Sequence, residues 1–323
     1  MIDVRKLSML EALDRLGTLT AVADELRLTA PGVSMQLGAF ERELGLTLTE
    51  RQGRRLALTP AGRLLASHGR DLLDRLSLTE REVDALHRGT IGTYRLAAFP
   101  TAARTFVADT WQRLIEDGSG IHLELTTPEP EEALTALSAG RIDLAVIHSY
   151  SNVPRQLPEG VEAESIATEP VWLALRSDDP VAAPIVDLSL LDSHPWIAAP
   201  PGVTCHEMTE RACGLAGYRP RVAAHSMDFA AQLALVAAGV GAALIPELAA
   251  DLIPDGVQLS RPVAPIHRHI QTARRTSLHG EPGLDRITHT LRETAGQRLQ
   301  TPLRQARGVR EVVMGRAEGT LGE

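Results

Sequence analysis

The first residues of the chain carry leucines at the spacing of a helix face. They stand at positions 7, 10, 13 and 16, and Gly17 follows the last of them. An amphipathic helix collects its hydrophobic residues on one side at steps of three and four, and glycine often ends a helix. The pattern therefore predicts a short helix over residues 7–16 that buries its leucines.

Two more helices are predicted directly after it. The second covers residues 20–26, is capped by Thr18 or Thr20 and ends in a tight turn. Thr29 caps the third helix, and Pro31 stands in its first turn, where a missing N–H costs nothing. The buried stripe of this third helix has spacings of four, three and four and consists of Val33, Leu37, Phe40 and Leu44.

Such a pair of short helices is typical of a helix-turn-helix, whose second helix enters the major groove of DNA. An arginine-rich turn centred on Gly53 follows and predicts a β-hairpin wing that lies along the phosphates. The candidate DNA-contacting residues are Thr29, Pro31, Ser34, Met35 and Gln36 of the helix and Arg51, Arg54 and Arg55 of the wing. Serine and glutamine can read base edges. A small helical module with a solvated arginine loop would show the same spacing, so the pattern alone leaves both interpretations open.

A longer helix is predicted over residues 59–88, with Pro60 at its first position. Its hydrophobic residues follow steps of seven, four, seven and three, which is a coiled-coil register, and they are Leu65, Leu72, Leu76, Val83 and Leu86. Gly69 and Thr79 interrupt the row at points where another helix could approach closely. The helix either joins two copies of the chain along this seam or packs as a surface helix on its own domain. Residues 89–92 are predicted to form the hinge to the next domain.

Strands and helices alternate from residue 93 to residue 300. Buried strands with helices between them predict a parallel sheet, and they are Tyr94–Ala98, His122–Leu125 and Ile142–Ile147. The next strands are expected at Glu169–Arg176, Trp196–Ala198, Arg221–Ala224 and Ala242–Ile245, and the helices among them at Cys205–Leu215 and Asp228–Ala238. A strand at His267–Ala273 and a helix at Leu284–Ala295 complete the pattern. We therefore expect two α/β lobes, the first from residues 93–161 and 267–300 and the second from residues 162–266.

Residues 19–62 read LTAVADELRLTAPGVSMQLGAFERELGLTLTERQGRRLALTPAG. In this order of motifs the chain resembles the LysR-type transcriptional regulators. Residues 93–296 are similar to that family's effector domain, and the best matches are RIDLAVIHSY, VWLALRSDDPVA, GLAGYRPRV and VAAGVGAALIPELAA. The resemblance implies an N-terminal all-α winged helix-turn-helix over residues 1–58, a linker and dimerisation helix over residues 59–88, and a C-terminal α/β effector domain, two-lobed and periplasmic-binding-protein-like.

The sequence departs from the family pattern at three positions in the N-terminal domain. Ala30 replaces a glutamine that helps to read a base in the family, which is expected to weaken or shift specificity. Thr49 replaces an aromatic residue, which is expected to cost packing under the wing. Gly38 lies in the middle of the third helix, where glycine costs about 1 kcal/mol relative to alanine.

The resemblance also implies a small-molecule effector in the cleft between the lobes. A ligand in an open α/β sheet lies beyond the carboxyl ends of the strands, against helix N-termini. The turns at these places supply the candidate effector-binding residues Pro100, Thr101, Ala102, Thr126, Thr127, His148, Ser149, Gly202, Thr204, Ser226 and Asp228. Hydroxyl and N–H groups suit a carboxylate or a similar anion, but Thr, Ser and Asp are also ordinary helix caps, so both roles stay open.

Composition narrows the classes of protein. Aromatic residues are only 3% of the 323 residues, so the core must be aliphatic, and two cysteines exclude a disulfide framework and favour a reducing cytoplasm. The net charge of −8 lies after residue 60, because the first sixty residues hold eight basic and eight acidic side chains. Nearly every positive charge is arginine, whose phosphate contacts are planar and bidentate. The uncharged segment Phe229–Pro246 is interpreted as a packed helix followed by a buried strand rather than as a membrane span.

Cysteines and histidines at His194, Cys205, His206 and Cys213 raise other hypotheses. A zinc site lacks a C-x-x-C motif. A redox pair of Cys205 and Cys213 is the stronger alternative, because some LysR-type peroxide sensors place two cysteines in this region. On a straight helix, however, the two would stand about 12 Å apart, too far for a disulfide without local unfolding. No common catalytic motif is present, and a solute-binding protein would need a signal peptide, which the N-terminus lacks.

The sequence thus predicts a cytoplasmic, non-enzymatic, DNA-binding transcription regulator with no metal and no cofactor besides a small-molecule co-inducer. Its implied partners are operator DNA, further copies of the chain in a homodimer or dimer of dimers, the effector, and RNA polymerase, but no membrane. A redox-sensing regulator of the same family is the alternative, and a small-molecule-binding module or an enzyme without DNA function is the weaker one. Residues 301–323 fit neither lobe and are expected to form a flexible tail.

Overall fold

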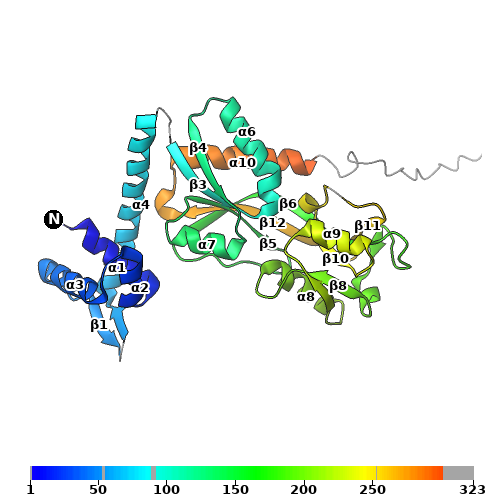
Figure 1. The fold of residues 1–323 in the computed structure, drawn as a ribbon, viewed down its shortest axis with the longest axis horizontal. Helices are drawn as coiled ribbons and strands as arrows, with labels where there is room; N and C mark the ends of the chain where they lie inside the picture. The colour runs from blue at the N-terminus through cyan, green and yellow to red at the C-terminus, as the bar shows by residue number, and fades with distance from the viewer. Residues whose placement is uncertain (1, 53–54, 89–91, 252, 301–323) are drawn as a thin grey trace, which may run out of the picture. The chain divides into compact units, whose positions relative to one another are not determined.

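The computed structural model describes residues 2–52, 55–88, 92–251 and 253–300 (Figure 1). The described residues form two compact units. The first holds the chain up to His148, with Arg155–Ile166 and Ile270–Arg292 added to it. The second holds Ser149–Pro154, Ala167–His269 and the residues from Glu293 onward.

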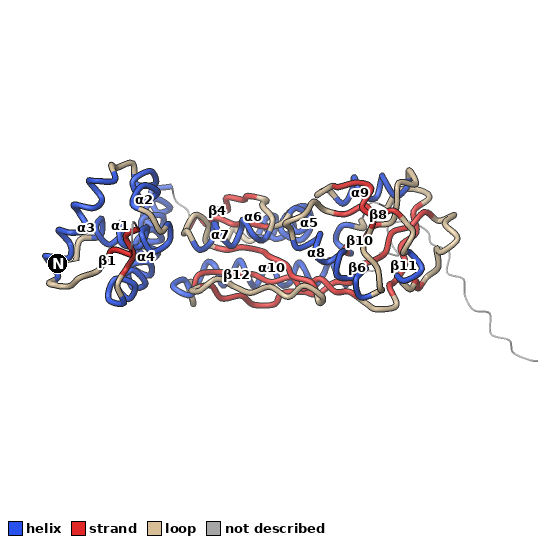
Figure 2. The backbone as a smooth tube through the Cα atoms, turned by 90° about the horizontal axis from the view of Figure 1, so that it is seen from below, coloured by secondary structure: helices blue, strands red, loops and turns tan. Residues whose placement is uncertain are grey.

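The N-terminal head is helical apart from one short hairpin (Figure 2). Its helices are α1 (Val4–Leu16), α2 (Leu19–Leu26) and α3 (Ala30–Leu44), and its strands are β1 (Thr49–Gln52) and β2 (Arg55–Leu58). The caps are those that the sequence predicted: the Thr18 hydroxyl accepts the Ala21 N–H at 3.2 Å, and Gly17 ends α1 with a φ of 71°. The prediction of a winged helix-turn-helix is therefore confirmed.

One hydrophobic core joins the three helices, the hairpin and the first turns of α4 (Pro60–Arg88). It contains Leu7, Leu10, Leu13, Val22, Val33, Leu37, Phe40, Leu48, Leu58 and Ala66. Leu65, which the sequence placed in the coiled-coil register, is partly buried and also packs against this core. The close approach expected at Gly69 lies within the head as well, because a Cβ on Gly69 would stand 2.8 Å from the Leu7 side chain of α1.

The two helix glycines Gly38 and Gly62 give a stability test of this packing. A Cβ on Gly38 would meet only Arg42 Nη1, at 3.6 Å, so Gly38→Ala is expected to stabilise the head by about 1 kcal/mol through helix propensity. A Cβ on Gly62 would stand 2.1 Å from the backbone oxygen of Leu48, so Gly62→Ala is expected to destabilise it. Thermal unfolding of both variants checks the pair, and a stabilised Gly62→Ala protein would contradict the observed approach of α4 to Leu48.

The α/β part of the first unit contains parallel strands, as predicted. β3 (Gly92–Ala98) pairs in parallel with β4 (Ile121–Thr126) and with β5 (Leu144–Tyr150). The helices are α5 (Pro100–Ala102), the π-helix η1 (Ala103–Val107), α6 (Ala108–Glu116), α7 (Pro130–Ser138) and, up to Arg292, α10 (Pro282–Gln300), with the short turn η4 (Thr276–Leu278) before α10. The sequence missed the break between α5 and α6, where Thr105 has a non-helical φ of −115° and ψ of −110°.

The second unit is built on the part of β6 (Val161–Arg176) from Ala167 onward, which pairs antiparallel with β10 (Ala243–Pro246) and β11 (Val257–Pro262). β7 (Ile185–Val186) pairs in parallel with β11, and β8 (Pro195–Ala198) with β9 (Arg221–His225). The remaining elements are α8 (Thr204–Leu215), α9 (Phe229–Ala237), η2 (Leu188–Leu191), η3 (Glu247–Ala249) and β12 (Ile266–Arg275), whose last residues belong to the first unit. α9 and β10 form the predicted helix and buried strand, and β7 and β11 were not predicted. Among the described residues, no helix is long and apolar enough to cross a membrane.

Candidate functional site

Three of the side chains that the sequence predicts to contact DNA lie on the outer face of α3. Ser34, Met35 and Gln36 are exposed, and Met35 retains 69% of its accessible surface. The opposite face is buried in the head core through Val33 and Leu37. The helix therefore holds its buried face against the head and leaves a polar face free for a partner, as an inserted recognition helix requires.

The first turn of α3 is exposed and capped. The Thr29 hydroxyl accepts the backbone N–H of Gly32 at 3.2 Å, and Pro31 stands exposed beside it. Thr29 therefore stabilises the helix N-terminus, where free N–H groups favour an anion such as a phosphate. Arg27, with a φ of 55°, makes the turn between α2 and α3.

A carboxylate on α3 anchors the wing, and the sequence gave no sign of it. Glu41 Oε1 accepts the backbone N–H groups of Leu48 and Thr49, each at 2.8 Å, and the Thr49 hydroxyl at 3.0 Å. Thr49 thus contributes a hydrogen bond, although its replacement of an aromatic residue was expected only to cost packing. Arg51 of the wing is exposed, whereas Arg54 and the side chain of Arg55 lie outside the described residues.

An ion pair fixes α2 on α1. Arg15 donates two hydrogen bonds to the Glu25 carboxylate, one from Nη1 at 3.0 Å and one from Nη2 at 2.5 Å. The hydrogen bonds from Arg15 hold the pKa of Glu25 below its usual value, and Glu25 raises the pKa of Arg15 in return. The pair joins the end of α1 to α2.

The candidate effector residues of the first unit differ in exposure. Thr101 and Ala102 are buried directly after β3, with Pro100 exposed before them. The Thr101 backbone oxygen accepts the hydroxyl of Thr105 at 2.6 Å, at the break in the helix. Thr126 and Thr127 are exposed at the end of β4.

His148 was placed in a turn by the sequence, but β5 continues through it. The ring is 1% exposed and meets the Phe99 ring edge-on, with 4.8 Å between the ring centroids. Its Nε2 lies 3.6 Å from a Glu129 carboxylate oxygen. Arg155 Nε donates to the backbone oxygen of His148 at 3.0 Å and its Nη2 to Glu131 at 2.9 Å, so polar groups gather at this end of the strand.

Four candidate effector residues of the second unit lie at the starts of two helices. Gly202 and Thr204 lie at the start of α8, and Ser226 and Asp228 lie at the start of α9. Gly202 has a φ of 93°, and Thr204 is 7% exposed at the first position of its helix. Asp228 accepts the Ala230 N–H at 2.9 Å and is an N-cap, while Ser226 accepts the N–H of Asp228 at 3.1 Å. Ser149, also of this unit, is buried within β5 rather than in a turn.

Two imidazoles share one acceptor near these turns. His206 Nδ1 and His225 Nδ1 lie 2.8 Å and 3.2 Å from the backbone oxygen of Ala199. A carbonyl oxygen only accepts, so each ring carries its proton on Nδ1 in this arrangement. The other ring nitrogen of His206, Nε2, lies 3.6 Å from a carboxylate oxygen of Glu210 on the same helix.

The two cysteines are both buried on α8. The Cys205 sulfur lies 3.3 Å from the Tyr150 hydroxyl, and Cys213 is fully buried. Burial raises the pKa of Cys213 from 9.0 to about 11, which keeps its thiol protonated at neutral pH. Because the thiolate is the reactive form of cysteine, the raised pKa of Cys213 disfavours a redox pair of Cys205 and Cys213.

Thiol chemistry tests that alternative directly. At pH 8 the raised pKa leaves about 100-fold less thiolate on Cys213 than an ordinary cysteine has, so iodoacetamide should label it at least about 100-fold more slowly in the folded chain than in guanidinium. Peroxide should leave no bond between Cys205 and Cys213. Mass spectrometry of labelled and peroxide-treated protein measures both. An internal disulfide in the folded chain would restore the redox hypothesis.

Known proteins resemble the chain over both parts. Residues 4–63 match the family described as "Bacterial regulatory helix-turn-helix protein, lysR family", and residues 87–296 match the "LysR substrate binding domain". The regulator ClcR of Pseudomonas putida is 29% identical over 279 residues, which cover 83% of this chain and 93% of ClcR. The chain belongs to the LysR family and is a LysR-type transcriptional regulator with an effector-binding domain.

Solved structures share the fold. Full-length CbnR in complex with its target DNA has a TM-score of 0.53 at 24% identity, and the match covers 91% of this chain and 99% of that one. A full-length OxyR variant from Pseudomonas aeruginosa has a TM-score of 0.61 at 18% identity, covering 93% and 97% of the two chains. At these identities the likeness concerns the fold alone.

Proposed function

We propose that the chain binds a specific DNA operator with the exposed face of α3 and the β1–β2 wing. The observation that carries the proposal is the exposure of Ser34, Met35 and Gln36 on a helix whose other face is buried. The structure of CbnR with its target DNA supports this use of the shared fold. Selection of bound sequences from a random duplex library by the full-length chain tests it, and a pool without any enriched motif would contradict it.

The arginines of the wing are proposed to contact phosphates rather than bases. Replacing Arg51, Arg54 and Arg55 by alanine is expected to weaken binding to every sequence and to lower the slope of log K against log salt by about one unit per lost contact. Fluorescence anisotropy at several salt concentrations measures the slope. An Arg211→Ala variant, altered in α8, serves as the control, and an unchanged slope in the wing variant would refute the assignment.

The effector is proposed to be a small molecule that carries a carboxylate or a similar anionic group. Thr101 and Thr204 are two of the candidate effector-binding residues that the sequence predicts, and each stands near the start of a helix. A ligand shifts the DNA-binding equilibrium only by its differential affinity for two states of the protein. Thermal shifts across a panel of small carboxylates, repeated with Thr101→Val and Thr204→Val, test this proposal.

The proposed assembly is a homodimer or a dimer of dimers that contacts RNA polymerase at the promoter. Leu72, Leu76 and Val83 of α4 support it, because they are 59%, 42% and 47% exposed in the single chain and would be covered by a second copy. The function is regulatory rather than catalytic in this proposal. Binding to chromosomal DNA would place the chain in the cytoplasm.

A further inference from the structure

The helix α4 has two faces with different surroundings in the first unit. Leu72 and Leu76 are exposed on one face, whereas Asp74 and Leu78 are only 8% and 4% exposed on the other. The buried face packs against β3 and η4 of the α/β part. An acidic residue is thus buried where the helix of the head meets the effector domain.

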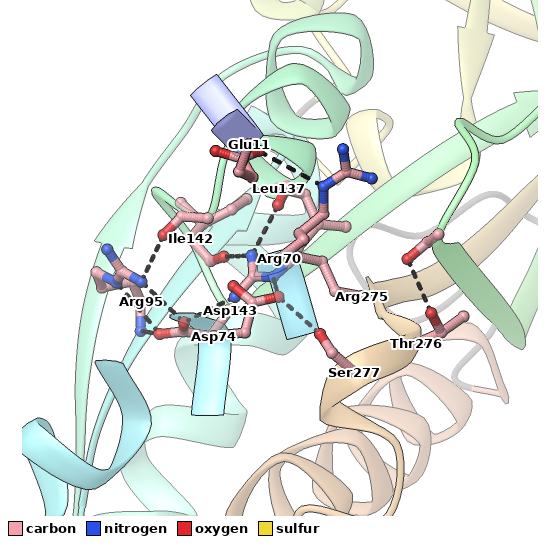
Figure 3. Close-up of polar contacts among 12 residues, drawn as sticks. Glu11, Arg70, Asp74, Arg95, Leu137, Ile142, Asp143, Arg275, Thr276 and Ser277 are labelled. Atoms are coloured by element: carbon pink, nitrogen blue, oxygen red, sulfur yellow. Dashed lines mark hydrogen bonds and ion pairs between the residues drawn. The ribbon is translucent and has the colours of Figure 1, made fainter. Parts of the chain in front are cut away.

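Asp74 is held by two donors, Arg275 at the end of β12 and Ser277 in η4 (Figure 3). Arg275 Nε donates to Asp74 Oδ2 at 2.7 Å, and the Ser277 hydroxyl donates to the same oxygen at 2.6 Å. The guanidinium is itself fixed, because its Nη1 donates to the backbone oxygens of Leu137 and Ile142 at 2.7 and 2.6 Å. Its Nη2 lies 3.6 Å from Asp143, so every nitrogen of Arg275 faces an acceptor.

The pair stands in the middle of a row of alternating charges, which we call the charge ladder. On the effector-domain side, the fully buried Asp143 accepts a hydrogen bond from Arg95 Nη2 of β3 at 2.9 Å. On the head side, Arg70 stands one helical turn before Asp74 and pairs with Asp14 of α1 at 3.1 Å. The ladder consists of Glu11 and Asp14 of α1, Arg70 and Asp74 of α4, Arg275 at the end of β12, Asp143 before β5 and Arg95 of β3.

Geometry distinguishes this contact from the leucines around it. Leucine contacts are non-directional and tolerate a small slide or rotation of a helix. A guanidinium whose donors point in a fixed fork at four acceptors allows one position only, and a buried charge pair is better attested as a device for register than as a source of stability. Arg275 therefore determines where along α4, and at which rotation, the effector domain holds the helix.

We propose that Asp74 is a positioning residue for DNA binding: its pair with Arg275 fixes α4 on the effector domain and so sets where the attached head stands. This inference rests on the proposed function, namely that the head binds an operator. The head itself needs no contact with Arg275 to fold, because its core is made by α1–α3, the hairpin and the start of α4. Loss of the pair should therefore change the placement of a head that remains intact.

Hydrogen exchange tests the contact without any ligand. Asp74→Asn keeps the shape of the side chain but removes the nearer of the two carboxylate charges that face the buried Arg275, so exchange of the α4 amides around residue 74 is expected to rise about 100-fold. The control Asp71→Asn removes the same charge from an exposed position one turn away and should leave exchange within about two-fold. Ser277→Ala, which removes one hydrogen bond, should give an intermediate rise and covers the case in which Asp74→Asn does not fold. Equal exchange in Asp74→Asn and Asp71→Asn would overturn the proposal.

DNA binding distinguishes a positioning role of Asp74 from a purely structural one. A purely structural role would not change how the DNA affinity depends on the number of half-sites. The operator selected by the wild-type chain is compared with a duplex that carries one of its half-sites. Asp74→Asn is expected to bind the single half-site within about two-fold of wild type but to lose about ten-fold or more on the full operator, because the second head is no longer held at the right spacing. Equal loss on both duplexes, or full-operator binding equal to that of Asp71→Asn, would overturn the proposal. If the wild-type chain selects no operator, the proposed function itself is contradicted. The two outcomes above contradict only the positioning role of Asp74.

Discussion

Replacing Glu169 by alanine is expected to lower the free energy of unfolding by about 3–5 kcal/mol, because it leaves a buried arginine without its counter-charge. Glu169 of β6 is fully buried, and Arg268 of β12 is 1% exposed. One Glu169 oxygen accepts Arg268 Nε at 2.6 Å, and the other accepts the Leu248 N–H at 2.6 Å. Urea unfolding followed by tryptophan fluorescence measures the effect, since Trp172 and Trp196 belong to the same unit.

Two further variants show whether the cost comes from the unpaired charge. Asp178→Ala breaks the exposed pair with Arg176 and should leave the unfolding midpoint unchanged. Combining Glu169→Leu with Arg268→Met removes both charges and should recover much of the lost stability. A Glu169→Ala protein as stable as Asp178→Ala would show that the pair is not buried in solution.

Replacing Ser34 and Gln36 by alanine is expected to reduce the preference for the operator over random duplex by about 10- to 100-fold for each base contact that is lost. Both side chains are exposed on α3, so the change leaves the core of the head intact. Competition binding of labelled operator against unlabelled random DNA measures the preference. The salt slope should stay as in wild type, because no phosphate contact is removed.

Ser8→Ala provides the matched control, since Ser8 belongs to α1 rather than to the outer face of α3. It should leave the preference unchanged. If the Ser34 and Gln36 variant instead loses affinity equally on operator and random DNA, the two residues contact only the backbone of the duplex and another surface reads the bases.

Short-range signals in the sequence were enough to predict the head. A cap such as Thr29 acts on an N–H three residues away, and Gly17 ends its own helix, so both effects can be recognised within a few residues. Strands with continuous apolar runs, such as β5 and β10, were predicted for the same reason. β7 has only two residues, and the apolar alternation of β11 is limited to Val257 and Leu259 before Pro262, so neither strand offers a long pattern.

Contacts between distant residues could not be predicted. Glu41 and Asp74 look like ordinary solvated charges on helices, yet one anchors the wing and the other pairs with a residue 201 positions away. Leu65 fitted a coiled-coil register but packs on the head, because a helix that emerges from a core shares its first turns with it. Periodicity shows that a face is apolar, and only the three-dimensional arrangement shows what covers it.

Competition binding of the full-length wild-type chain, with its selected operator against random duplex at a fixed salt concentration, tests most directly whether α3 reads DNA sequence. A specific regulator should prefer the operator by at least about 1,000-fold, and the Ser34 and Gln36 variant should lose most of that preference. A wild-type preference near one, or a preference that survives both substitutions, would contradict the assignment of this helix face as the surface that recognises the operator.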